Sequence, residues 1–190
     1  MGPAALTPQA YLRFLRRLRA VRRFAPRPIP QQVLDDVIET GRWTGSSKNS
    51  QPWELVVVRD RERLRALAML GRFAGHLAGA AAGIVLVMES PATAFDAGRL
   101  AQQLMLAAWA HGVGSCIASI FPEENEARAK ALLGVPDARW VRTAISLGYP
   151  ADAAARRVSS TPETARVLPA VGRKPLERFV SWERYGQRAP

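Results

Sequence analysis

Four short apolar runs, separated by segments with helical periodicity, constrain the fold of this chain more than any other feature. The runs contain many β-branched residues, have the length of buried strands, and cover residues 55–58, 84–88, 115–118 and 141–147. Because helical segments lie between them, this alternation predicts an α/β or α+β architecture. The length of 190 residues and the 48% hydrophobic content fit one domain with its own core.

Apolar residues recur at helical spacing between and around these runs. Helices are predicted from Thr7 and Pro8 to about Arg19, after the connector 25–30 up to Gly41, over 60–70, up to Ala82 and over 123–133. Residues 151–174 are predicted to form an extended crossing segment, and 175–185 a short terminal element.

A longer helix is predicted from Asp96 to about His111, and it is apolar nearly all round. Leu100 and Leu104 fall on one face, whereas Met105 and Trp109 fall on others. A helix without a solvated face is buried on more than one side. It is therefore either a central core helix or a helix that packs against a partner subunit.

Basic residues exceed acidic residues, and the excess is concentrated near the N-terminus. The chain has 27 Lys and Arg residues against 16 Asp and Glu residues, a formal charge of +11, and the first acidic residue is Asp35. Seven arginines precede Asp35: residues 13, 16, 17, 19, 22, 23 and 27. Three interpretations are open: a solvated basic surface, a nucleic-acid-binding arm, or a site for a small phosphorylated ligand.

Most catalytic motifs are absent from the sequence. The single cysteine, Cys116, lies in an apolar strand and is predicted to be inert core, and no cysteine and histidine spacing indicates a metal site. His76 and His111 have no acidic neighbour in sequence, and no phosphate loop, dinucleotide fingerprint or acyl-transfer serine motif occurs. An enzyme built from this chain would therefore need an organic cofactor. With no export signal or membrane-spanning run, we expect a cytoplasmic protein.

Three groups of residues carry a resemblance to a known family. They are the RAVRRF motif at 19–24, the SSKNSQPW motif at 46–53, and GYP at 148–150 together with RKPL at 173–176. In this order and at these separations they resemble the nitroreductase family of FMN-dependent oxidoreductases, over residues 11–182. The NSQPW core is the most specific part.

The resemblance implies an α+β fold in which helices flank a mixed sheet. It further implies an intertwined homodimer with FMN in two clefts at the subunit interface. Residues 1–190 would form a single nitroreductase-like domain, with the C-terminal segment 151–190 crossing to the partner subunit. The long apolar helix matches the family's dimer helix.

The resemblance also assigns residues to the cofactor site. Arg19, Ala20 and Arg22 in the first motif and Arg173 near the C-terminus correspond to residues that hold the flavin phosphate and ring edge. An arginine fork suits this task because it satisfies two phosphate oxygens at once. The sequence does not decide which arginine serves the phosphate.

Further contacts are implied by the loop and by the third strand. Asn49 offers an amide that can pair with a flavin edge, and Ser46 and Gln51 are secondary candidates from the same loop. The backbone amides of Ala118 and Ser119 are expected near the reactive flavin nitrogen. No residue is predicted as a dedicated general acid.

Two departures from the family pattern concern the phosphate. Many relatives have arginine where this chain has Leu18, and serine where it has Ala20. Three consequences are open: compensation by Arg16, Arg17 or Arg23, weaker binding of FMN, or a different preferred cofactor.

The expected activity is hydride transfer from NAD(P)H through the flavin to a nitroaromatic, quinone or similar small-molecule acceptor, in ping-pong order. The alternative is a non-catalytic basic module that binds nucleic acid or a phosphorylated ligand.

Overall fold

The computed structural model describes residues 7–152 and 175–187. The chain divides into two units, Met1–Arg156 and Arg157–Pro190. The first unit contains the sheet and most helices, and the second contains the short helix α7 (Leu176–Phe179). Most of the predicted crossing segment, residues 153–174, lies outside the described residues.

A four-stranded antiparallel sheet forms the centre of the first unit. Its strands are β1 (Trp53–Val58), β2 (Ala82–Met88), β3 (Gly114–Ser119) and β4 (Trp140–Gly148). They lie in the order β1-β2-β4-β3, and all three neighbouring pairs are antiparallel. The four predicted strands are confirmed, each longer by two residues. Among the described residues, parallel pairing occurs at the isolated bridge between Ala20 and Ser115.

Five of the predicted helices are also confirmed, with shifted ends, whereas the stretch predicted up to Ala82 forms only a short 3₁₀ turn and Ala82 itself begins β2. The five helices are α1 (Pro8–Arg17), α2 (Gln31–Arg42), α3 (Arg61–Ala68), α4 (Ala94–Ala110) and α5 (Glu123–Leu133), with short 3₁₀ turns η1 (Ser47–Asn49), η2 (Gly75–Gly79) and η3 (Pro91–Thr93). Thr7 caps α1 as predicted, and the Asp60 side chain caps α3 by accepting the Arg63 N–H at 2.8 Å.

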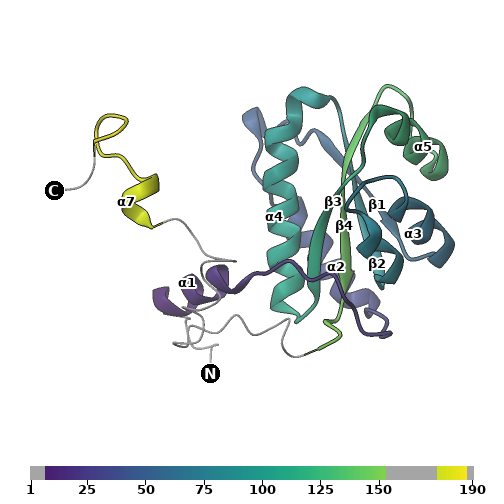
Figure 1. Ribbon diagram of the computed structural model, residues 1–190, viewed down its shortest axis with the longest axis horizontal. Helices are drawn as coiled ribbons and strands as arrows, with labels where there is room; N and C mark the ends of the chain where they lie inside the picture. Colours follow the sequence, from purple (N-terminus) through teal and green to yellow (C-terminus); the bar gives the residue numbers. More distant parts are fainter. Residues whose placement is uncertain (1–6, 153–174, 188–190) are drawn as a thin grey trace. The chain divides into compact units, whose positions relative to one another are not determined.

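The sheet separates two hydrophobic cores. On β2, Ile84 and Leu86 face a core built with α2 and α4, and Val85 faces a second core built with α3, η2 and α5. Every residue of β2 is buried, as expected for a central strand covered on both faces. Figure 1 shows α4 on one side of the strands and α3 and α5 on the other.

One helix of this unit has no buried residue. On α1, the apolar side chains of Tyr11, Leu12 and Leu15 are each about half exposed. The helix is amphipathic as predicted, yet its apolar side remains largely uncovered by the described part of the chain. No helix among the described residues is long and apolar enough to cross a membrane.

Candidate active site

The segment after α1 is fixed to the end of the sheet by backbone pairing. Ala20 bridges Ser115 at the start of β3, and the Val21 N–H donates to the Ser115 carbonyl at 2.9 Å. Further along, the Ala25 N–H donates to the Tyr149 carbonyl at 2.8 Å. In Figure 1 this segment runs from α1 across the strands towards α2. The predicted arginine motif therefore has a defined backbone position.

Two glycines make this close approach possible. Gly114 and Gly148 face each other across β3 and β4. A Cβ on Gly114 would lie 2.7 Å from the Val21 Cβ, and one on Gly148 would lie 2.7 Å from the Phe24 ring. Neither position needs a left-handed backbone, so the requirement is space alone. The glycines let Val21 and Phe24 pack directly on the sheet, which positions the arginines between and beside them.

The two predicted arginines of this motif have different surroundings. Arg19 donates from Nη1 to the carbonyls of Arg16 at 2.6 Å and Leu18 at 2.8 Å, at the end of α1. This leaves its Nε and Nη2 groups to meet a ligand. Arg22 is exposed, and its charge acts on both the Cys116 thiol and the His76 ring. It therefore lies near these two side chains. Both cations therefore lie at the start of the β3 edge.

A polar network that the sequence did not reveal lies beneath Arg22. His76 Nδ1 lies 2.7 Å from Ser146 Oγ, which donates to the Cys116 carbonyl at 3.2 Å. Because that hydroxyl hydrogen is used, His76 is the donor from Nδ1. Burial, and then the charge of Arg22, lower the pKa of His76. The histidine is therefore a neutral support for β3 near neutral pH.

Cys116 lies in the same network and fits the predicted inert role. Its side chain is 3% exposed, and burial raises the pKa of the thiol, with Arg22 acting in the opposite direction. A thiol kept protonated is a poor nucleophile.

Some backbone groups of β3 point away from β4, at the outer edge of the sheet beside the arginines. The Ser115 carbonyl points away from β4, since it accepts from Val21. Backbone groups alternate along an antiparallel strand, so the N–H groups of Ile117 and Ser119 also point to this edge. Both residues are exposed, whereas Ala118 is buried with its side chain in the second core. Of the two predicted backbone positions, Ser119 has the suitable orientation.

The second predicted half of the site is the loop before β1, and its backbone is unusual. Lys48, Asn49 and Gln51 all have positive φ angles, of 52°, 54° and 49°. Such angles are uncommon for residues other than glycine and gather at functional sites. Ser46 Oγ accepts the Gln51 N–H at 2.8 Å and so closes the loop. Asn49 and Gln51 are exposed, whereas Ser46 has a structural contact.

One chain does not bring the two halves together. The loop precedes Trp53, which pairs with Met88 at one end of β2. Ser115 pairs with a β4 residue that in turn pairs with Ala82, which lies six positions from Met88 at the other end of β2. The two points also lie on opposite edge strands. With about 3.3 Å per residue and about 4.8 Å per strand, they are roughly 20 Å apart along the strands and 14 Å across. The two halves lie at diagonally opposite corners of the sheet.

The same separation appears along α4, which has a cleft at each end. A cleft of about 770 Å³ beside its N-terminal half is lined by loop residues including Thr44 and by Phe95 and Arg99. A cleft of about 490 Å³ at its C-terminal end is lined by Arg13, Arg17, Phe14 and Trp109, among others. Phe95 and Trp109 are about 21 Å apart along the helix axis.

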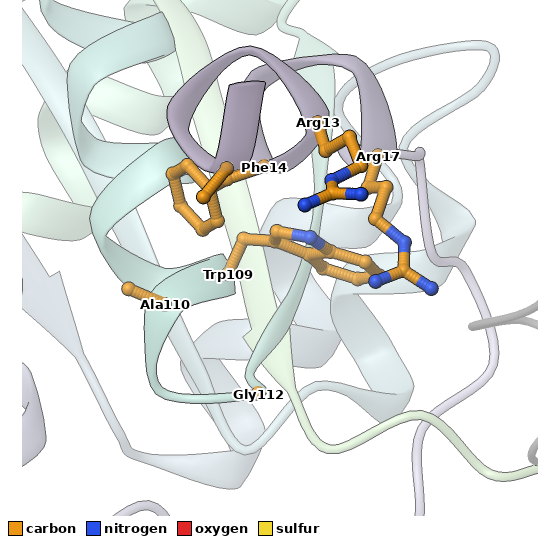
Figure 2. A pocket seen from close by; sticks show the side chains of 7 residues that line it. Arg13, Phe14, Arg17, Trp109, Ala110 and Gly112 are labelled. Atoms are coloured by element: carbon orange, nitrogen blue, oxygen red, sulfur yellow. The ribbon is translucent and has the colours of Figure 1, made fainter. Parts of the chain in front are cut away.

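Two of the other N-terminal arginines line the cleft near α1. Figure 2 shows Arg13 and Arg17 extending from α1 towards the indole of Trp109, and neither has an ion-pair partner among the described residues. Arg23, by contrast, pairs with Asp152 at 2.5 Å. Arg17 is therefore better placed than Arg23 to meet an anion. Arg173 lies outside the described residues.

The sequence also missed a pairing of His111. Its Nε2 lies 3.2 Å from a carboxylate oxygen of Asp36 on α2. No local signal could have found this contact, because the two residues are distant in the chain and meet where α2 packs on α4. Among the described residues, no group of three or more metal-ligating side chains occurs.

The comparisons with known proteins agree with this architecture. Residues 15–91 and 75–149 match the Nitroreductase family. A protein of Archaeoglobus fulgidus, provisionally named an NADH dehydrogenase/NAD(P)H nitroreductase, is 30% identical over 142 residues, which cover 70% of this chain and 82% of the relative. The nitroreductase NfnB of Mycolicibacterium smegmatis is 29% identical over 209 residues, covering 81% and 88%.

A solved structure supports the fold. An FMN-dependent nitroreductase from Clostridium difficile superposes with a TM-score of 0.76 at 21% identity, covering 90% of this chain and 98% of that chain. At this identity the likeness concerns the fold.

Proposed function

The chain belongs to the nitroreductase family, and from this premise we propose that it is an FMN-dependent oxidoreductase that takes hydride from NAD(P)H. The proposed acceptor is a nitroaromatic, a quinone or a similar small molecule, and the proposed order is ping-pong. The observation that carries the proposal is the outer edge of β3, where cationic side chains and outward-facing N–H groups lie along one line.

The donor set on this edge suits FMN. Arg19 and Arg22 lie at the start of β3, where guanidinium groups can bind a phosphate dianion. The outward N–H of Ser119 lies on the same edge, four residues and about 13 Å from Ser115. An elongated ligand with an anionic end and a hydrogen-bonding ring fits this arrangement. Arg173 remains a predicted contact.

When bound, FMN supplies the ring that accepts and releases hydride. The residues of this chain bind and orient it. Arg22 neutralises phosphate charge, and the Ser119 N–H directs a hydrogen bond to the ring. The exposed Ile117 side chain, 46% accessible, gives the ring an apolar contact beside these donors. His76 and Ser146 support the edge strand, because Ser146 donates to the Cys116 carbonyl and His76 holds the Ser146 hydroxyl.

For Asn49 to contact the same flavin as Arg22, its loop has to come from a second copy of the chain. Because the two halves lie at opposite corners of the sheet and at opposite ends of α4, a two-fold dimer with antiparallel α4 helices would bring the loop of one subunit to the β3 edge of the other. The exposed apolar residues Tyr11, Leu12 and Leu15 on α1, together with Trp43 and Phe95, support such an interface. We therefore propose a homodimer with two composite sites.

Flavin binding and reduction test the proposed function. The purified protein is expected to be yellow, or to bind added FMN with one site per chain, and NADH or NADPH should bleach the bound flavin without oxygen. Reoxidation by a panel of nitroaromatics and quinones then identifies the acceptor. A protein that ignores FMN and instead shifts labelled DNA with steep salt dependence would overturn the proposal.

A further inference from the structure

A separate cleft with three arginines lies away from the β3 edge. It has a volume of about 290 Å³ and is lined by the connector from Ala25 to Pro28, by Arg59 and Arg61, and by Gly79 and Ala81. This places it where β1 ends and β2 begins. The flavin half sites described above consist of Arg19, Arg22 and the β3 edge, and of the loop before β1, and none of these residues lines this cleft.

Neutral groups hold the three guanidinium groups in place. Arg59 donates to the Gln31 side chain at 3.0 Å and to the Ile29 carbonyl at 3.3 Å. Arg61 donates to the Ala80 carbonyl at 3.0 Å. The Arg27 guanidinium lies 3.9 Å from the centre of the Tyr149 ring, a cation–π distance. The side chains are therefore positioned without a carboxylate.

In the described part of the chain no carboxylate pairs directly with the charge in this cleft; the nearest link to one is Gln31, whose amide donates to Asp35 at 2.8 Å. Among the described residues, none of Arg27, Arg59 and Arg61 belongs to an ion pair. The nearest acid in sequence, Asp60, uses its carboxylate to cap α3. Three fixed guanidinium groups around a concave surface focus positive potential, and each offers a planar fork for phosphate oxygens.

From these observations we infer that this cleft binds a small oligophosphate anion. The volume lies at the lower end for ligand sites, so it suits a diphosphate group better than a whole nucleotide. Three cations match an anion with about three negative charges. The arginines retain unused N–H groups, because Arg61 uses one donor and Arg59 two.

Calorimetric titration of the FMN-saturated protein with pyrophosphate at low salt tests the inference. We expect saturable binding of pyrophosphate. FMN should stay bound, which its absorbance reports. Arg27→Gln and Arg61→Gln should each weaken binding roughly tenfold or more, since each removes charge-assisted hydrogen bonds. Within the described residues the Arg27 side chain makes no hydrogen bond, only its contact with the Tyr149 ring, so its variant separates loss of binding from loss of structure.

Two further variants sharpen the result. Arg65→Gln removes the same charge from the exposed surface of α3, outside the cleft, and should leave the affinity unchanged. Arg61→Lys keeps the charge without the planar fork and should restore only part of the affinity. Release of FMN by pyrophosphate, an equal loss in Arg65→Gln, or equally tight binding of sulfate would each overturn the inference.

Discussion

The contact between Gly114 and Val21 allows a quantitative prediction for Gly114→Ala. The added Cβ would lie 2.7 Å from the Cβ and Cγ2 of Val21 and 2.9 Å from its Cγ1. All three atoms are close to the backbone, and Val21 is only 2% exposed, so the side chain cannot turn away. The segment 20–24 must therefore move off the sheet.

The cost has two parts. Overpacking of this kind typically costs about 1–3 kcal/mol, and weakening the 2.9 Å Val21 to Ser115 hydrogen bond adds about 1 kcal/mol. For a domain of this size each kcal/mol lowers Tm by roughly 2–4 °C, so we expect a loss of several degrees. FMN affinity should fall as well, because Arg22 moves with the segment.

Thermal unfolding and FMN titration of the same preparations measure both effects. Gly75→Ala is the matched control, since a Cβ there meets nothing within 4 Å. We expect Gly75→Ala to match the parent protein in Tm and in Kd for FMN. If Gly114→Ala also matched it in both, the reasoning that the glycine positions the arginine segment would be refuted.

Three further predictions concern single side chains. His76→Asn keeps a donor for Ser146 Oγ but removes the titrating ring. Because the pKa of His76 is lowered in the folded chain, the folded chain binds fewer protons than the unfolded chain as pH falls through about 6.5, and the parent protein loses stability on acidification. Urea unfolding should show this loss in the parent and a smaller loss in the variant. Asp60→Ala removes the α3 cap and should cost about 0.5–2 kcal/mol in the same assay. Arg22→Ala should weaken FMN binding strongly without unfolding the protein, whereas Arg23→Ala, which breaks an exposed ion pair, should change stability by less than about 1 kcal/mol and leave FMN affinity intact.

Much of the fold could be predicted from the sequence because its signals are local. The β-branched run that became β2 and the Thr7 and Pro8 start of α1 depend on neighbouring residues only. Strand order was not predicted, since β2 pairs with both β1 and β4 across long intervals of chain. The all-round apolar α4 was recognised as unusual, and the structure adds that its two ends adjoin different halves of the site.

The site was predicted less completely. The motif residues were found by resemblance, but the distance between Arg22 and Asn49 follows only from the register of the sheet. The facing of Gly114 and Gly148 could not be predicted from the sequence, because both accommodate side chains from a distant segment. The contact of His76 with Ser146 likewise joins residues 70 positions apart.

Subunit complementation tests the composite site most directly. Arg22→Ala and Asn49→Ala alter opposite halves, so each variant alone is expected to bind FMN poorly. If the halves come from different subunits, mixing and exchanging the two variants creates dimers with one intact site, and about a quarter of all sites should recover FMN binding. A double variant carrying both changes in one chain, treated alone in the same way, should recover none. The absence of any recovery in the mixture, with subunit exchange verified by mass, would contradict a site shared between two copies.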